Sequence, residues 1–142
     1  MTIKLYCFGE SGNAYKAALT LELCGMDWEP VFVDFFNGET RTDAFRQKLN
    51  PMGEAPVMVD DASGTHLTQS GTIQDWAVEQ SGKLGGADAS QRREILRWVL
   101  WDNHKLSGQA GMTRFLMNYL PEDKRPAEVI AFMQGRLKAT YA

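Results

Sequence analysis

Residues 50–70 read NPMGEAPVMVDDASGTHLTQS, and this stretch decides the fold. Pro56 opens an apolar strand that ends in an Asp-Asp-Ala-Ser-Gly segment typical of a turn, and a second short strand follows over residues 65–68. The polar pair Gln69-Ser70 then leads into an apolar helical pattern. The stretch therefore predicts a hairpin followed by a helix, an arrangement that presents backbone groups to a small ligand.

The chain before this stretch predicts two strands that alternate with two helices. The evidence is alternation over residues 3–8, helical spacing over 13–24, an aromatic-rich run over 28–36 and a short helical pattern over 43–49. Because the first strand–helix–strand unit is parallel, the order βαβ followed by ββα predicts a mixed four-stranded sheet with helices on both faces.

The chain after this stretch changes character. Residues 83–88 are Gly-rich and predict a linker, and residues 89–142 show helical periodicity without strand patterns. Within that region Gly108 predicts a kink or break. Trp98 and Trp101 are three apart on one helical ridge, which favours a place in the core.

The bulk composition excludes several classes of protein. The chain has 142 residues, 44% of them hydrophobic, and a net charge of -3 without a basic run, which argues against a nucleic-acid surface. No segment approaches the roughly 18 consecutive apolar residues that span a bilayer, and the N-terminus lacks a leader pattern. Cys7 and Cys24 are expected to be reduced thiols in the cytoplasm, and with only His66 and His104 we expect no metal site.

Ser11 and Cys7 are the first candidates for chemistry. Ser11 lies in a Gly-flanked turn before a helix, where capping is the more common role. Beside a bound thiol, its hydroxyl could instead donate to the thiolate and lower the thiol pKa. Cys7 competes as the reactive group, but strand parity places it with Ile3 and Leu5, which favours a buried structural thiol.

The segments around Pro56 and Ser70 also have two interpretations each. Ala55 could pair through its backbone with an extended peptide-like ligand, or Pro56 could be an edge-strand proline without a ligand. Ser70 is predicted to be an N-cap, yet the same helix start could hold a carboxylate while the amide oxygen of Gln69 accepts from an ammonium group. Together the pair matches an amino-acid head group.

Four motifs, in this order and at this spacing, resemble the N-terminal half of cytosolic glutathione S-transferases, with serine-type bacterial members as the best match. The resemblance covers the first 82 residues closely, and the helix over residues 95–106 resembles the second domain of the bacterial members. The motifs are KLY at 4–6, SGNAYK at 11–16, NP to PVMVD at 50–60 and LTQSGTI at 67–73.

The resemblance implies a thioredoxin-like domain over residues 1–82 that binds glutathione as co-substrate. It implies that Pro56 is a cis-proline, that Ala55 pairs with the cysteinyl part, and that Gln69 and Ser70 hold the γ-glutamyl end. A linker over 83–88 and an all-helical domain over 89–142 would follow. Because family members run to about 200 residues, we expect this helical domain to be truncated.

The resemblance also assigns the catalytic task. Ser11 falls where serine-type members place the residue that stabilises the thiolate, and Asn13 is a weaker candidate for the same task. Two positions depart from the family pattern. Gln69 stands where Glu is frequent, and Glu54 stands where Lys, Arg or Gln is usual, so a weaker hold on glutathione is expected.

The expected function is that of a glutathione transferase, which conjugates glutathione to a small electrophile in detoxification. The expected setting is a cytoplasmic homodimer without nucleic-acid or membrane partners. Two alternatives stay open: a glutathione-dependent disulfide reductase or peroxidase, and a non-catalytic glutathione-binding module with the transferase fold. The identity of the electrophile does not follow from the sequence.

Overall fold

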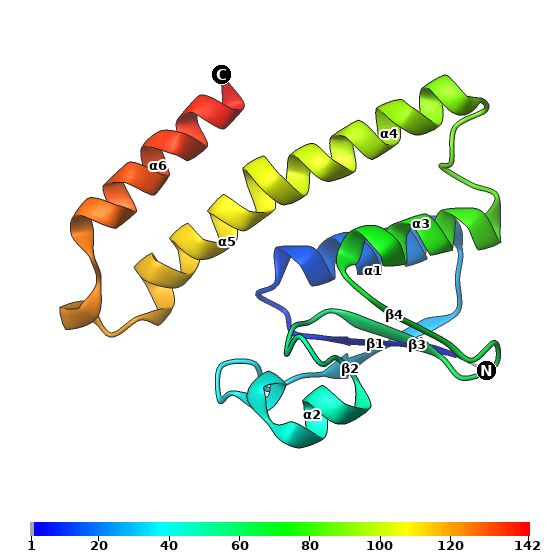
Figure 1. The fold of residues 1–142 in the computed structure, drawn as a ribbon, viewed down its shortest axis with the longest axis horizontal. Coiled ribbons are helices and arrows are strands. Elements are labelled where there is room, and N and C mark those ends of the chain that lie inside the picture. The colour runs from blue at the N-terminus through cyan, green and yellow to red at the C-terminus, as the bar shows by residue number, and fades with distance from the viewer. Residues whose placement is uncertain (1) are drawn as a thin grey trace. The chain divides into compact units, whose positions relative to one another are not determined.

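A computed structural model describes residues 2–142 and divides the chain into two compact units, one ending at Ala87 and the other spanning Asp88–Ala142. The first unit is built on a four-stranded sheet of order β2-β1-β3-β4 (Figure 1). Strands β1 and β2 are parallel, and β3 is antiparallel to both β1 and β4, which confirms the predicted mixed sheet. Its elements are β1 Ile3–Cys7, α1 Gly12–Cys24, β2 Trp28–Phe32, α2 Asp43–Lys48, β3 Val57–Asp60, β4 Thr65–Thr68 and α3 Ser70–Ser81.

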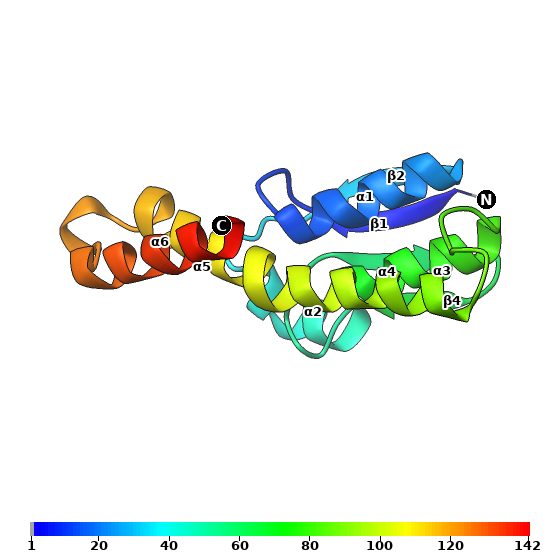
Figure 2. The ribbon, with the colours of Figure 1, turned by 90° about the horizontal axis from the view of Figure 1, so that it is seen from above.

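Helices cover both faces of this sheet, as predicted. Helices α1 and α3 lie along one face and α2 lies on the other (Figures 1 and 2). The larger core cluster joins α1 and α3 to the sheet, and each fully buried Leu or Ile in it contributes about 1.5–3 kcal/mol. Trp28 and Trp76 pack against its margin. The buried members of this cluster are Ile3, Leu5, Ala17, Leu21, Cys24, Met58, Ile73 and Ala77.

A smaller cluster fixes α2 against the opposite face. Its buried side chains are Val33, Phe45 and Val57, and Tyr6 packs beside them. Helix α2 begins at Asp43 because the Thr42 hydroxyl accepts from the Phe45 backbone N–H at 3.2 Å, an N-cap that satisfies one free donor.

The second strand is shorter than the sequence pattern predicts. Strand β2 ends at Phe32, whereas the aromatic run continues to Phe36. The chain turns after Val33 because the Glu39 carboxylate accepts from the Asp34 backbone N–H at 2.6 Å, and a 3₁₀ turn over Glu39–Arg41 follows. A local side-chain acceptor thus replaces a strand partner for this backbone group.

The second unit is entirely helical. Helix α4 spans Ala89–Trp101, α5 spans Gly108–Arg114 and α6 spans Ala127–Tyr141. The chain does not break at Gly108, because a π-helical turn over Asp102–Ser107 joins α4 directly to α5 (Figure 1). Gly108 itself has helical angles, φ -64° and ψ -44°. A second π-helical turn covers Phe115–Tyr119, and a 3₁₀ turn covers Glu122–Lys124.

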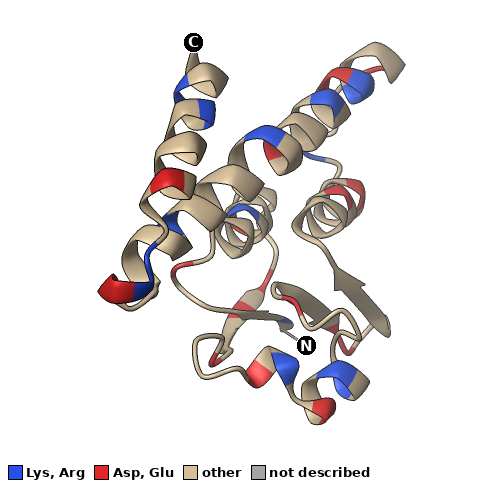
Figure 3. Cartoon of the chain, turned by 60° about the vertical axis from the view of Figure 1, so that its left-hand side comes forward, with Lys and Arg blue, Asp and Glu red and all other residues tan. Residues whose placement is uncertain are grey.

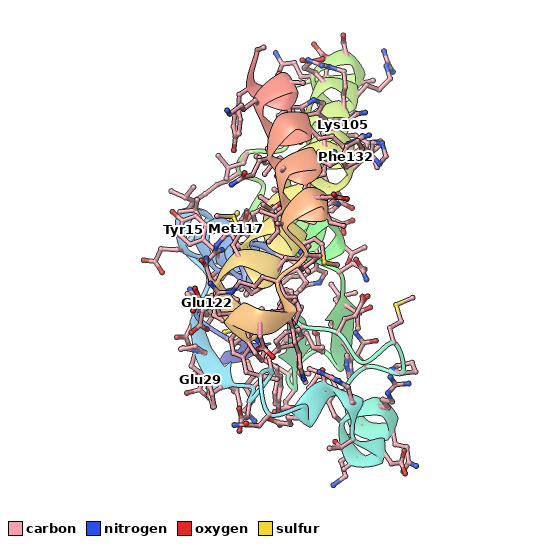
Figure 4. The ribbon with its side chains drawn as sticks, turned by 90° about the vertical axis from the view of Figure 1, so that its left-hand side faces the viewer. Tyr15, Glu29, Lys105, Met117, Glu122 and Phe132 are labelled. Carbon is pink, nitrogen blue, oxygen red and sulfur yellow. The ribbon has the colours of Figure 1, made fainter. Side chains whose placement is uncertain are left out.

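The helical unit leaves large apolar side chains exposed. Trp98 is 51% exposed, so its predicted place in the core is wrong, while Trp101 is half-buried and meets it edge to face at 5.4 Å. The Arg97 guanidinium lies 4.5 Å from the centre of the Trp98 ring. Phe132 on α6 is 66% exposed (Figure 4).

Positions of Lys or Arg and of Asp or Glu are interspersed along both units (Figure 3). Among residues 2–142, no helix is long and apolar enough to cross a membrane.

Candidate functional site

Three separate segments meet at one end of the sheet because of the strand register. Tyr6 near the end of β1 pairs with Val57, the first residue of β3, and Val57 pairs with Thr68, the last residue of β4. Because β3 is antiparallel to both neighbours, the loop after β1, the start of β3 and the segment that follows β4 lie at the same end of the sheet. All six predicted site residues lie in these segments or next to them.

Ser11 caps helix α1, as one interpretation of the sequence predicts. Its side-chain oxygen accepts from the Ala14 backbone N–H at 3.1 Å, and its backbone is extended with φ -82° and ψ 113°. Capping uses a lone pair of the hydroxyl and leaves its proton free to donate. The residue is half-buried at this end of the sheet, so its hydroxyl can cap the helix and still donate its proton to a ligand.

The Ala55-Pro56 peptide is cis, in agreement with the expectation for Pro56. Pro56 is buried at the start of β3, and Ala55 is half-buried just outside the strand. The backbone of Ala55 makes no hydrogen bond to another backbone group among the described residues. Its N–H and C=O are therefore open to an extended ligand.

The start of α3 differs from the prediction. Gln69, not Ser70, occupies the N-cap position, without a side-chain cap bond, and Ser70 is the first helical residue. Gln69 has a φ of 69° and a ψ of 125°, a region that non-glycine residues rarely adopt. The first backbone N–H groups of α3 therefore lack a side-chain cap, which leaves them available to an anion.

Ser70 links the starts of the two helices. Its side chain is buried, with the residue 4% exposed, and its hydroxyl donates to the Asn13 amide oxygen at 3.3 Å. Asn13 lies in the first turn of α1 and is exposed. The structure thus brings Asn13 to Ser70.

Asn50 is a positioning residue that the sequence analysis missed. It is 1% exposed, its amide N–H donates to the Glu54 carbonyl at 2.9 Å, and its amide oxygen accepts from the Met52 backbone N–H at 3.0 Å. These bonds fix the loop that leads to Ala55. The available signal was an Asn before a proline at the start of a turn, which favours such side-chain-to-backbone bonds.

The two departures from the family pattern contact each other. The Gln69 amide nitrogen donates to the Glu54 carboxylate at 2.8 Å and lies 3.8 Å from the Met52 sulfur. Fourteen intervening residues separate Glu54 from Gln69 in the sequence. Their hydrogen bond is therefore a contact between residues distant in the sequence, which hydrophobic periodicity does not reveal.

Cys7 has the properties of a structural thiol. It is half-buried, is not in a disulfide and packs against the larger core cluster. Burial raises the pKa of the Cys7 thiol, because desolvation disfavours the thiolate. The parity argument for Cys7 therefore agrees with its observed surroundings.

An aromatic cluster that the sequence analysis also missed lies after β1 and β2. The rings of Phe8 and Phe35 stack with centroids 4.4 Å apart, and both meet Phe36 edge to face. The Phe8 carbonyl accepts from the Ser11 backbone N–H at 3.2 Å, so this apolar surface is tied to the Ser11 loop.

A cavity also lies elsewhere, within the helical unit. It has a volume of about 370 Å³ and is lined by Trp101, Lys105, Gln109, Arg136, Ala139 and Thr140. None of the predicted site residues lines it. The candidate site is identified by the polar groups that meet at the end of the sheet, not by the volume of a cavity. Within residues 2–142, no group of three His, Cys, Asp or Glu side chains is placed to hold a metal ion.

Comparisons with known proteins agree with this geometry. Residues 1–79 match the family model described as the N-terminal domain of glutathione S-transferase. A zeta-class glutathione S-transferase of Euphorbia esula is 38% identical over 140 residues, which cover 99% of this chain and 61% of the plant protein.

Solved structures extend the similarity over both units. The glutathione S-transferase of Pseudomonas fluorescens has a TM-score of 0.84 at 31% identity, covering 99% of this chain and 68% of that one. A glutathione transferase of Pseudomonas putida, crystallised with one glutathione disulfide per subunit, has a TM-score of 0.81 at 25% identity, covering 98% and 61%. The chain spans about half the length of the curated relatives it matches.

Proposed function

Because this chain belongs to the glutathione S-transferase family, we propose that it binds glutathione at the end of the sheet described above and transfers it to a small electrophile. Ser11 stabilises the glutathione thiolate. Ala55, Pro56, Gln69 and Ser70 position the tripeptide.

The strand register is the observation that carries this proposal. Tyr6, Val57 and Thr68 are neighbours across β1, β3 and β4, so the three segments with open polar groups converge. An extended tripeptide has a backbone in its middle and charged groups at its ends. The converging segments offer a backbone partner, a hydroxyl donor and a helix N-terminus in a matching order.

The binding half of the site uses two types of interaction. The open N–H and C=O of Ala55 pair with the cysteinyl residue as an added strand does. The uncapped start of α3, from Ser70 onward, holds the γ-glutamyl carboxylate through its free N–H groups and positive dipole end. The relative from Pseudomonas putida, which was crystallised with glutathione disulfide, supports a ligand of this class.

The catalytic half of the site lowers the thiol pKa. The Ser11 proton is directed to the sulfur of bound glutathione, and a hydrogen bond to the charged form favours that form. The thiolate then attacks an electrophilic carbon, forming a carbon–sulfur bond as the leaving group departs with its electron pair. Holding both reactants together supplies the rest of the rate increase.

The substitution Ser11→Ala tests this role. It removes a hydrogen bond to a charged group, which is worth about 1.5–3 kcal/mol and corresponds to a rise of about one to two units in the pKa of bound glutathione. The thiolate absorbance of the complex, titrated against pH, reports the shift, and conjugation at neutral pH falls with the thiolate fraction. An unchanged titration would refute the assignment of Ser11.

Two further variants separate catalysis from capping. Ser11→Asp keeps a cap acceptor for Ala14 but has no proton to donate when ionised, so it should fold normally and still lose conjugation. Ser90→Ala removes an exposed hydroxyl from the start of α4 and should leave the titration unchanged.

A specific observation also favours a second candidate, reduction of a glutathione mixed disulfide. The Pseudomonas putida relative was crystallised with glutathione disulfide. In this reaction the same thiolate attacks a disulfide sulfur, a new sulfur–sulfur bond forms and a thiolate leaves. Turnover of a disulfide substrate that exceeds conjugation across a panel of aryl halides and epoxides would favour it.

We further propose that the chain acts as a homodimer in the cytoplasm, with detoxification of electrophiles as its role. The cysteine pattern, two cysteines without a C-x-x-C pair, is typical of proteins from a reducing compartment. Sedimentation velocity on the purified chain tests the dimer.

A further inference from the structure

Glu54 and Gln69 form a paired unit at the γ-glutamyl end of the proposed site. The Gln69 amide nitrogen donates to a Glu54 carboxylate oxygen at 2.8 Å. Both side chains are exposed, and Glu54 forms no ion pair with a described Lys or Arg. The carboxylate therefore keeps its negative charge free for a ligand.

The direction of this hydrogen bond orients the Gln69 amide. An ionised carboxylate only accepts hydrogen bonds, so the amide nitrogen must be the group that faces Glu54. The Met52 sulfur, 3.8 Å from the same nitrogen, is a second acceptor on that side. The Gln69 amide oxygen is consequently turned away from Glu54 and is available as an acceptor.

The loop holds Glu54 in place through its backbone. The Glu54 carbonyl accepts from the buried Asn50 amide at 2.9 Å. Gly53 has a φ of 70°, and a Cβ added there would lie 2.8 Å from the Thr40 carbonyl oxygen, so the position before Glu54 requires glycine and packs closely against Thr40. The carboxylate is therefore presented from a constrained loop.

An amino-acid head group has two opposite charges, and the start of α3 can stabilise only one of them. The helix N-terminus favours the carboxylate and disfavours the ammonium group. Gln69 is neutral. The ammonium group therefore needs an anion, and the Glu54 carboxylate is the anion in contact with Gln69.

We propose that Glu54 supplies the negative charge that binds the γ-glutamyl ammonium of glutathione, with the Gln69 amide oxygen as a second acceptor. This inference rests on the proposed glutathione site. It replaces the expectation that Glu54 weakens the hold on glutathione: the contact with Gln69 places this side chain at the end of the ligand that carries the ammonium group.

Binding calorimetry with two ligands tests the proposal. The probes are glutathione and glutaryl-cysteinyl-glycine, which has the same backbone and thiol but lacks the amino group. Glu54→Gln should weaken glutathione binding about tenfold, the size of one lost charge-assisted hydrogen bond. Binding of the desamino analogue should not weaken, which also shows that the variant is folded.

A charge exchange and a matched control complete the test. Glu54→Gln combined with Gln69→Glu moves the carboxylate to the helix start and should restore glutathione affinity to within about threefold. Glu29→Gln, which removes an exposed carboxylate from β2, should leave both affinities unchanged.

The outcomes separate this inference from the proposed function. Glu54→Gln binding glutathione as tightly as the unsubstituted chain, or more tightly, overturns the inference alone. An equal loss of affinity for both ligands also overturns it, because the Glu54 carboxylate would then not act through the ammonium group. Failure of the unsubstituted chain to bind glutathione overturns the proposed function, and the inference with it.

Discussion

At the scale of single residues, Ser11 shows why capping and catalysis need not be rival explanations. Its oxygen accepts from the Ala14 backbone N–H, while its proton is not needed by that bond. The sequence places a serine at a helix start but does not say which part of the hydroxyl is used. The geometry assigns the lone pair to the helix and leaves the proton for a ligand.

Cys7 gives a prediction that follows from its raised pKa. The folded state favours the neutral thiol, so alkylation of Cys7 by iodoacetamide at pH 8 should be slower than that of free cysteine. The stabilisation from this neutral thiol is present below the pKa of the unfolded chain and is lost as pH rises through the higher folded pKa. Mass spectrometry of the labelled peptide measures the rate.

Cys7→Ala is the matched variant for this prediction. It should keep its affinity for glutathione and its thiolate titration, since Cys7 belongs to the core side of β1. Alkylation as fast as that of free cysteine, or loss of conjugation in the variant, would contradict a structural role.

At the scale of elements, the type and order of the first seven helices and strands could be predicted, because each has a clear period or turn signal. The exceptions have local physical causes. Strand β2 ends at Phe32 because the Glu39 carboxylate accepts from the Asp34 backbone N–H, and hydrophobic periodicity does not reveal that bond. The helix passes through Gly108, which has ordinary helical angles directly after the π-helical turn.

The segments that form the candidate site could be predicted from the sequence, but the contacts between them could not. Ser11, Ala55, Pro56, Gln69 and Ser70 were identified from turn chemistry and from resemblance, and the register places their segments together. The roles of these residues remain predictions. The contacts that arrange the site, such as Ser70 with Asn13, join elements distant in sequence and follow only from tertiary packing.

The loop before β3 gives a prediction at this scale. Asn50→Ala removes two hydrogen bonds and leaves the Glu54 carbonyl and the Met52 N–H without their partner, which should lower the free energy of unfolding by about 2–4 kcal/mol. Glutathione affinity should fall as well, because the same loop positions Ala55. Urea denaturation and calorimetry measure the two effects.

Asn50→Asp serves as a second variant. It retains an acceptor for the Met52 N–H but faces the Glu54 carbonyl with a buried negative charge, so its loss of stability at neutral pH should be at least as large as that of Asn50→Ala. A stability equal to the parent for both variants would rule out Asn50 as an organiser of the loop.

At the scale of the whole molecule, the two units differ sharply in their cores. Every buried apolar side chain among the described residues belongs to the unit that ends at Ala87. The helical unit has Thr113 as its buried residue, and that side chain bonds to the Gln109 carbonyl of its own helix. The helical unit of this chain is therefore held mainly by local helical bonds.

Hydrogen exchange should reveal this difference. Backbone amides of residues 88–142 should exchange through openings of lower free energy than those of β1, β3 and α1, because few buried apolar contacts oppose their opening. Exchange followed by mass spectrometry of peptides assigns the rates to each unit. Equal protection in α6 and in β1 would contradict this expectation.

The placement of the four tryptophans has a practical consequence. Trp28 and Trp76 lie at the margin of the sheet core, and Trp98 and Trp101 lie in the helical unit. Each unit thus contains its own pair of intrinsic fluorophores. Replacing one pair with phenylalanine yields a chain whose emission reports on a single unit, so melting of the sheet and of the helices can be followed separately without an attached dye.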